Sequence, residues 1–269
     1  MVRILHASEI AACVGMNKYK SVEDAKMDVW KRWDPPSFRQ ASERNFIVAH
    51  KTPEEVFASI GPSVRKLVSN AVSSETEKAA TKIVEVAMNE KANDVVAPEA
   101  VQAILKAASE KKPVDEAFNT MRGTQNEHKG IALYENAKRV KLHGKNLKFY
   151  KKCIGETGAG TKVFVGGRVD GLTDDKVIEV KSRRSRLFST LPLYEKVQVQ
   201  AYMFLTDKPV AEVVQKYDGI MRSDEYVVDT EFWAEVCGAA LKFASELENL
   251  IDAQSSQDDF LSVVAPLNS

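Results

Sequence analysis

The sequence predicts an α/β (α+β) protein with a mixed central sheet flanked by helices and an added α-helical insertion. The segment Val163–Ser182 is typical of a hairpin, because β-branched residues stand on both sides of a Thr-Asp-Asp-Lys turn. Apolar residues recur at helical spacing over 192–206, and residues 116–138 also favour a helix. The strand-like run 210–217 follows the helix 192–206, so it can return parallel to the hairpin.

The expected core therefore runs helix, three strands, helix, strand. Strands joined by short turns are antiparallel, whereas the strand after the helical crossover can lie parallel, which makes the sheet mixed. The remaining expected elements are strands at 147–154 and 225–229 and a final helix from Glu231. Near the N-terminus we expect a short helix after Ser8 and a second one from Val22 to Trp30.

Composition shifts divide the chain into four expected regions. Pro35-Pro36 precedes a stretch rich in Ala, Glu, Lys, Ser and Val, which predicts two or three amphipathic helices of structural or oligomer-facing purpose. The regions are an N-terminal helical part of the core (1–34), the insertion (35–114), the main core (115–252) and a mobile, Gln-Ser-Asp-rich tail (253–269).

Bulk composition excludes several classes of protein. The 38 basic and 38 acidic residues give a net charge of zero, so binding to a polyanion requires locally gathered cations, such as those at 181–186. A solvated, turn-flanking charge run is the alternative interpretation of that segment. The three cysteines have no C-x-x-C spacing, which argues against a disulfide framework, a zinc site or an iron–sulfur cluster. Without an apolar run of membrane-spanning length or a signal-peptide pattern, we expect a soluble, intracellular protein, in the cytoplasm or a host nucleus.

Three polar residues inside the hairpin point to chemistry. Asp170 ends its first arm, while Glu179 and Lys181 lie two apart on the second arm and so share a face. Carboxylates in a half-buried sheet are costly unless they are paired or hold a cation. A structural Glu179–Lys181 ion pair or a solvated face would be the unremarkable explanations. The spacing favours a metal site.

These residues resemble the PD-(D/E)xK nuclease signature, with Val169 in place of the proline. More closely, the chain resembles the lambda-exonuclease or YqaJ-type viral recombinase branch of that superfamily. Four blocks in the family's order carry the resemblance: Ala7–Ile10, Arg122–Glu127, the hairpin, and Gln198–Tyr202. The resemblance implies the restriction-endonuclease-like αβββαβ core.

The resemblance and the chemistry together suggest a fuller site. Glu127 becomes a third carboxylate beside Asp170 and Glu179, and the Val180 carbonyl is a further oxygen ligand. Such hard oxygens favour Mg²⁺, for which Mn²⁺ can substitute, and Lys181 would orient water or stabilise negative charge. Expected DNA- or phosphate-binding residues are Ser8, Lys18, Arg122, Gln198, Tyr202, Arg183 and Arg184. Ser8 could equally be a helix cap, and Gln198 a plain surface residue.

By this resemblance we expect a Mg²⁺-dependent exonuclease that degrades one strand from double-stranded DNA ends, 5′ to 3′, in viral recombination or DNA processing. The resemblance also implies a single-strand annealing partner and a homo-oligomeric ring trimer. A structure-specific endonuclease or resolvase on the same core, a catalytically silent DNA-end-binding scaffold and an RNA hydrolase are the alternatives.

Overall fold

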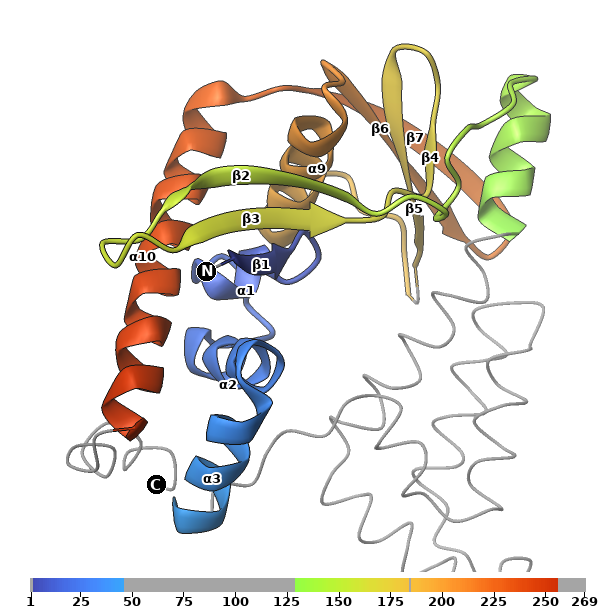
Figure 1. The fold of residues 1–269 in the computed structure, drawn as a ribbon. Helices are drawn as coiled ribbons and strands as arrows, with labels where there is room; N and C mark the ends of the chain where they lie inside the picture. Colours follow the sequence, from blue (N-terminus) through green and yellow to red (C-terminus); the bar gives the residue numbers. More distant parts are fainter. Residues whose placement is uncertain (1, 46–128, 184, 256–269) are drawn as a thin grey trace, which may run out of the picture.

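The computed structural model describes residues 2–45, 129–183 and 185–255, which form two sheets and their covering helices (Figure 1). The first, sheet A, contains β1 (Val2–His6), β2 (Tyr150–Glu156) and β3 (Lys162–Gly167) in the order β1-β3-β2. β1 runs parallel to β3 and β2 runs antiparallel to it. β1, which is only five residues long, was not predicted from the sequence.

Sheet B contains β4 (Gly171–Leu172), β5 (Lys176–Ser182), β6 (Val210–Tyr217) and β7 (Ile220–Val227), in that order. The helix α9 (Leu193–Thr206) connects β5 to β6, and these two strands are parallel as expected. The β4–β5 and β6–β7 pairs are antiparallel. The predicted α+β class with mixed sheets is confirmed.

The expected single central sheet is instead divided in two. The division falls at residues 168–170, between the end of β3 and the start of β4. β4 pairs with β5 only through Gly171↔Ile178 and Leu172↔Val177, so the rest of that edge of β5 has no strand beside it within the described chain. This interruption positions the candidate site described below.

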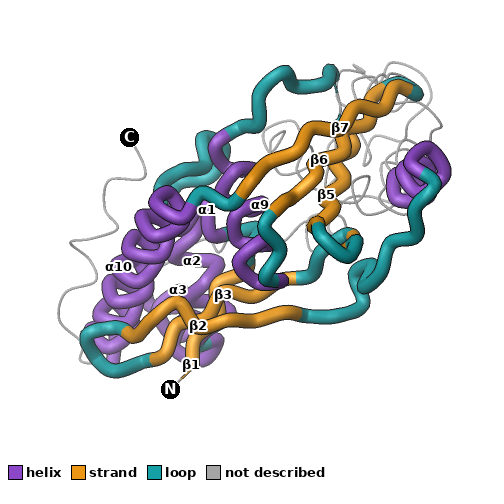
Figure 2. Tube along the Cα trace, turned by 90° about the horizontal axis from the view of Figure 1, so that it is seen from above, coloured by secondary structure: helices purple, strands orange, loops and turns teal. Residues whose placement is uncertain are grey.

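Helices cover one face of sheet A. They are α1 (Ile10–Cys13), α2 (Val22–Trp33), α3 (Pro35–Asn45) and α10 (Thr230–Ser255), together with α9. Viewed from above, α9 and α10 lie on the same side of β2 and β3 (Figure 2). A further helix, 129–138, packs Ile131 and Tyr134 against Ile178 and Val180 of β5.

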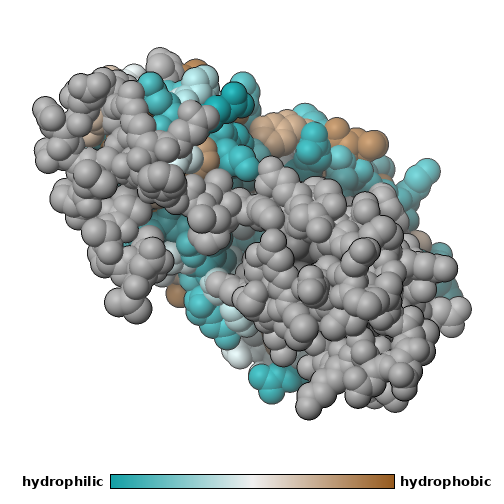
Figure 3. All heavy atoms as spheres, turned by 90° about the horizontal axis from the view of Figure 1, so that it is seen from below, coloured by the Kyte–Doolittle hydropathy of each residue, from teal (hydrophilic) through white to brown (hydrophobic). Residues whose placement is uncertain are grey.

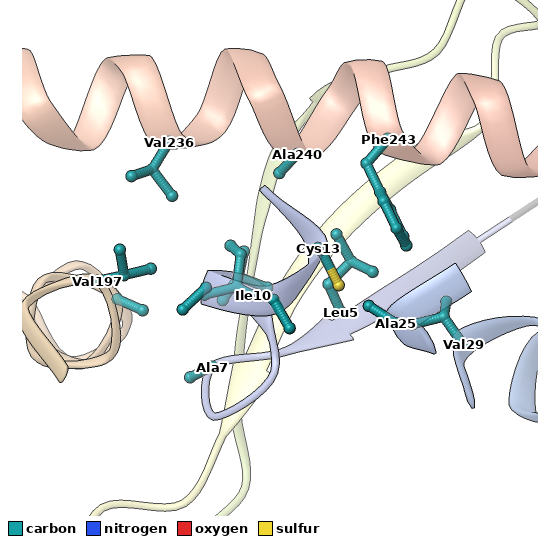
Figure 4. Close-up of a cluster of buried hydrophobic side chains, with 14 of the residues drawn as sticks. Leu5, Ala7, Ile10, Cys13, Ala25, Val29, Val197, Val236, Ala240 and Phe243 are labelled. Carbon is teal, nitrogen blue, oxygen red and sulfur yellow. The ribbon is translucent and has the colours of Figure 1, made fainter. Parts of the chain in front are cut away.

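The main core lies between sheet A and these helices. Leu5, Val163 and Val165 point inward from β1 and β3 and are fully buried. In the close-up of Figure 4, Ile10 lies between Val197 of α9 and Leu5 of β1, and Ala240 points toward this cluster from α10. The burial of alternate strand residues explains the hydrophobic pattern of both segments. Seen from below, the described residues at the surface are mostly hydrophilic (Figure 3).

The N-terminal helices begin differently from one another. α2 starts with a capping box, in which the Ser21 hydroxyl accepts from the Asp24 N–H at 3.0 Å. α1 is only four residues long and its N-cap is Glu9, whose side chain makes no capping hydrogen bond. The alternative in which Ser8 caps this helix is therefore wrong.

The predicted division into regions is only partly visible. Pro35 and Pro36 begin α3, whose Phe38 and Ala41 pack into the main core, so the first turns of the predicted insertion join the N-terminal part. Residues 46–114 lie outside the described residues. The predicted tail also lies outside them, apart from its first residues, 253–255, which belong to α10. The insertion therefore stays a prediction. Among the described residues, no helix has the length and apolar character needed to cross a membrane.

Candidate active site

Asp170 ties the break between the sheets to β5. It follows β3 and precedes β4, and its Oδ2 accepts a hydrogen bond of 2.7 Å from the Val180 N–H. This side-chain contact occupies a position where a continuous strand would supply a ladder bond. Asp170 is largely buried, so its carboxylate is held close to the middle of β5.

Glu179 is the most unusual side chain of the site. It is 3% exposed, and its Oε1 forms an ion pair of 2.6 Å with the Lys181 Nζ. Its Oε2 is buried without a hydrogen-bond partner among the described residues. Burial, together with the negative charge of Asp170, raises the pKa of Glu179 to about 8. A carboxylate in this position is poorly compensated by the protein alone.

Lys181 is fixed by two partners. Its Nζ donates to the Gln198 Oε1 at 2.9 Å as well as pairing with Glu179. The Gln198 Nε2 in turn donates to the Tyr202 hydroxyl at 2.9 Å, one turn further along α9. Burial alone would lower the pKa of Lys181, but the negative charges of Glu179 and Glu195 raise it above its ordinary value. Lys181 therefore stays an ammonium at neutral pH.

The close approach of α9 to the strands depends on Gly167. A Cβ at this position would lie 3.1 Å from Cε1 of Tyr202 and 3.2 Å from Cβ of Ala7. A glycine before Arg168 and Asp170 thus allows the helix carrying Gln198 and Tyr202 to pack directly on the site. Gln198 is not a plain surface residue, because it links Lys181 to Tyr202.

Asp170 and Glu179 offer hard oxygens that suit Mg²⁺. The orphaned Glu179 Oε2 is the observation that fits a bound cation best, since a cation would compensate this buried charge. The N–H and C=O of one strand residue point to the same side of the strand. The Val180 carbonyl therefore points to the same side of β5 as the Val180 N–H, which donates to Asp170. No group of three metal-ligating side chains occurs within the described part of the chain, and Glu127 and Arg122 lie outside it.

Arg183 does not belong to an exposed basic run, which corrects the sequence-based interpretation. It is 7% exposed, and its Nη2 donates to the Glu195 Oε2 at 2.7 Å while its Nε donates to the Gln215 Oε1 at 2.8 Å. The guanidinium also lies 4.2 Å from the ring centre of Phe188. Arg183 therefore holds α9, β6 and the loop after β5 together instead of facing a DNA backbone.

Sequence reasoning missed the partners of Arg183. Glu195 opens the first turn of α9, where an acidic residue is ordinary, and Gln215 is a single polar residue in an apolar strand. The local sequence around Glu195 and Gln215 does not indicate a partner, because these residues approach Arg183 only through the parallel pairing of β5 with β6. Arg184, the next residue of the predicted basic run, lies outside the described residues.

The predicted phosphate-binding residues Ser8 and Lys18 are both exposed. Lys18 lines a pocket of about 390 Å³ together with Arg186, and three aromatic residues share the lining: Tyr19, Phe188 and Tyr194. Lys18 and Arg186 form no ion pair with any described carboxylate. The pocket thus places two cations beside aromatic rings, at the N-terminal end of α9. Ser8 is not among its lining residues.

Comparisons with known proteins give structural similarities only. No protein-family model matches the chain, and no curated protein matches it. The chain is similar to the alkaline exonuclease LHK-Exo from Laribacter hongkongensis, with 17% identity, 76% of this chain and 96% of that chain covered, and a TM-score of 0.40. It is also similar to a phage-related exonuclease from Haemophilus somnus 129PT, with 15% identity, 79% and 99% coverage, and a TM-score of 0.40.

A third similar structure is that of SSO0001, with 14% identity, 78% of this chain and 98% of that chain covered, and a TM-score of 0.41. At these identities and TM-scores, the similarities do not by themselves assign an activity to this chain.

The Arg183–Glu195 pair predicts a large and partner-dependent effect on stability. Glu195→Leu leaves a buried guanidinium uncompensated and should lower the free energy of unfolding by about 3–5 kcal/mol, whereas the double variant Arg183→Met, Glu195→Leu should recover most of that loss. Lys196→Met removes a more exposed ion pair, between Lys196 of α9 and Asp229 before α10, and should cost less than about 1 kcal/mol. Urea denaturation measures all three. Equal losses for Glu195→Leu and Lys196→Met would show that the buried pair has no special role.

Proposed function

We propose that this chain is a Mg²⁺-dependent DNA exonuclease that degrades one strand from a duplex end, 5′ to 3′, in viral recombination or DNA processing. The observation that carries the proposal is the convergence of Asp170, Glu179 and Lys181, with one Glu179 oxygen buried and unpartnered. A scaffold protein gains nothing from such a costly arrangement.

Asp170 and Glu179 would hold the cation, with the Val180 carbonyl and, by resemblance, Glu127 as further ligands. When bound, Mg²⁺ supplies charge neutralisation at the phosphoryl oxygens and activation of the attacking water. The protein holds Asp170 in place through the Val180 N–H, so this carboxylate is already oriented before a cation arrives. Preorganised ligands of this kind avoid reorganisation during the reaction.

Lys181 has a separate role. Two described acceptors, Glu179 and Gln198, hold its ammonium, which has three N–H donors. The remaining donor can hydrogen-bond the attacking water or a phosphate oxygen as negative charge develops. Tyr202 and Gln198 are positioning residues, because they act on the reaction through the orientation of Lys181.

The pocket containing Lys18 and Arg186 supports recognition of a phosphate group at a DNA end. Two cations without described carboxylate partners attract a phosphate monoester, and the neighbouring rings of Tyr19 and Tyr194 suit a terminal nucleotide. This pocket would limit attack to ends and so distinguish an exonuclease from an endonuclease. Two of the similar solved structures are exonucleases. The annealing partner and the ring trimer stay predictions.

The proposal predicts which substrates are cut. A linear duplex with 5′-phosphates and an end label should be degraded in Mg²⁺ and not in EDTA, while covalently closed circles remain intact. Asp170→Asn and Lys181→Ala should each lower the rate by at least about 100-fold, since each removes a charge at the reacting phosphate. Asp174→Asn, an equivalent change in the exposed turn before β5, is the matched control and should cut normally.

Equal cutting of circles and linear DNA would reject the exonuclease and favour an endonuclease on the same core. Identical behaviour of wild type and Lys181→Ala would reject the enzyme. Preferential cutting of a ribo-substituted strand would indicate an RNA hydrolase.

The raised pKa of Glu179 predicts that Mg²⁺ binding depends on pH. At pH values below the Glu179 pKa of about 8, the metal-free carboxyl is protonated, so Mg²⁺ must displace a proton to bind. The affinity of the protein for Mg²⁺ should therefore rise by up to about tenfold per pH unit between pH 6 and 8. Calorimetry in buffers of different ionisation enthalpy should detect about one proton released per site at pH 6.5 and less at pH 9. A constant affinity with no proton release would contradict the assignment of Glu179 as a ligand.

The same shift affects stability with a definite sign. Because the folded pKa of Glu179 lies above its ordinary value, the folded protein binds the proton more tightly than the unfolded chain does. The contribution to stability is therefore fully present at acidic pH and is lost as pH rises towards 8. Mg²⁺ should offset this loss by favouring the ionised carboxylate.

A further inference from the structure

The face of sheet A that points away from the main core carries aromatic and basic side chains. Strand residues alternate between faces, so the neighbours of the buried Leu5, Val163 and Val165 point outward. The outer face of sheet A, as we use the term, consists of Ile4, His6, Phe149, Lys151, Phe164 and Arg168. None of these residues is buried. The described helices lie on the other side of β2 and β3 (Figures 1 and 2).

Phe149 lies flat on this outer face. A Cβ at Gly166 would come within 2.6 Å of the Phe149 Cζ, so the ring occupies the space that only a glycine leaves over β3. His6 meets the ring edge-on, with centroids 6.1 Å apart. Phe149 is still 40% exposed, which leaves an aromatic surface available to solvent.

Cations stand next to the two phenylalanine rings. The Arg168 guanidinium lies 5.7 Å from the centre of Phe149, and the Lys151 Nζ lies 5.7 Å from the centre of Phe164. Neither cation forms an ion pair within the described part of the chain. By contrast, Lys152, the next residue of β2, pairs with Asp207, and Lys145 pairs with Glu135 at 2.6 Å. Lys151 and Arg168 thus place two positive charges without a described counterion on the outer face.

We propose that the outer face of sheet A binds single-stranded nucleic acid. Bases would stack on Phe149 and Phe164, and phosphates would contact Lys151 and Arg168. The exposed Phe149 and the half-buried Phe164, each beside a cation, suit a single strand, because its bases are free to stack. The bases of a duplex are already stacked on each other. In a chain of zero net charge, this local grouping is also what attraction to a polyanion requires.

The outer face leads directly to the candidate active site, because Arg168 precedes Asp170 by two residues. This placement rests on the proposed function: if one strand of a duplex is degraded at Asp170, the other becomes single-stranded beside the outer face. The outer face of sheet A would retain that strand next to the site and favour continued digestion of the same DNA molecule.

Fluorescence anisotropy with a labelled oligothymidine tests the proposal on the full chain in EDTA, where no cleavage takes place. Phe149→Leu keeps an apolar side chain but removes the aromatic face, and it should weaken binding about tenfold, whereas Phe149→Tyr should bind as wild type. Lys151→Gln should reduce the slope of log affinity against log salt by about 0.7. Lys242→Gln, an exposed lysine on α10, is the matched control and should leave the slope unchanged.

Unchanged binding by Phe149→Leu, or no binding of the oligomer by wild type, would overturn the proposal. A change in sedimentation instead of binding in Phe149→Leu would show that the face is a contact between copies of the chain, and would overturn it as well. Failure of the proposed function looks different. If the wild-type protein cuts no nucleic acid but binds oligothymidine through Phe149, the proposed nuclease function is rejected and binding by the outer face is kept. If both proposals hold, Asp170→Asn should bind the oligomer normally.

Discussion

The buried carboxylate of Glu179 is the constraint on which the rest of the site depends. One oxygen is neutralised by Lys181 and the other has no described partner, while Asp170 adds a second negative charge nearby. Burying such a group is costly, and the protein meets only part of that cost through the ammonium. In the proposed function, a cation bound by the two carboxylates would offset this cost. The proposal of a cation therefore rests on burial and charge, independently of any resemblance between sequences.

The break between the two sheets makes this arrangement possible. If β3 continued alongside β5, a neighbouring backbone would occupy the edge where the Val180 N–H now reaches the Asp170 carboxylate. The interruption at residues 168–170 leaves that edge to a side chain. It also ends sheet A at Gly167, so that Arg168 of the outer face lies two residues from Asp170. Chemistry and the proposed strand-binding face share one structural cause.

Much of the fold could be predicted because its signals are local. Apolar periodicity located α9 to within a residue and β6 at its observed ends, and the hairpin turn chemistry located β5. β1 was missed because a five-residue segment becomes a strand only through its parallel pairing with β3. The division into two sheets was missed because it also depends on contacts between distant segments. The Asp170 side chain accepts a hydrogen bond from Val180 of β5, and no local sequence pattern specifies this contact.

The site shows the same limit. Asp170, Glu179 and Lys181 could be proposed from spacing along the predicted hairpin, and the structure brings them together with Gln198 and Tyr202. The hairpin itself was wrong, because its first arm is β3 of sheet A and only the two-residue β4 pairs with β5. Arg183 was misread, because its sequence neighbours are basic while its true partner, Glu195, is twelve residues away on α9. A run of charges indicates solvent exposure only when no buried acid faces it. Glu127, the remaining predicted ligand, lies outside the described residues.

Anomalous diffraction from crystals grown with Mn²⁺ would test the central claim most directly. The account predicts one strong anomalous peak in contact with both Asp170 and Glu179, with the Glu179 Oε2 as a ligand and Lys181 still held by Gln198. A peak located elsewhere, or carboxylates that remain uncoordinated at saturating Mn²⁺, would contradict it.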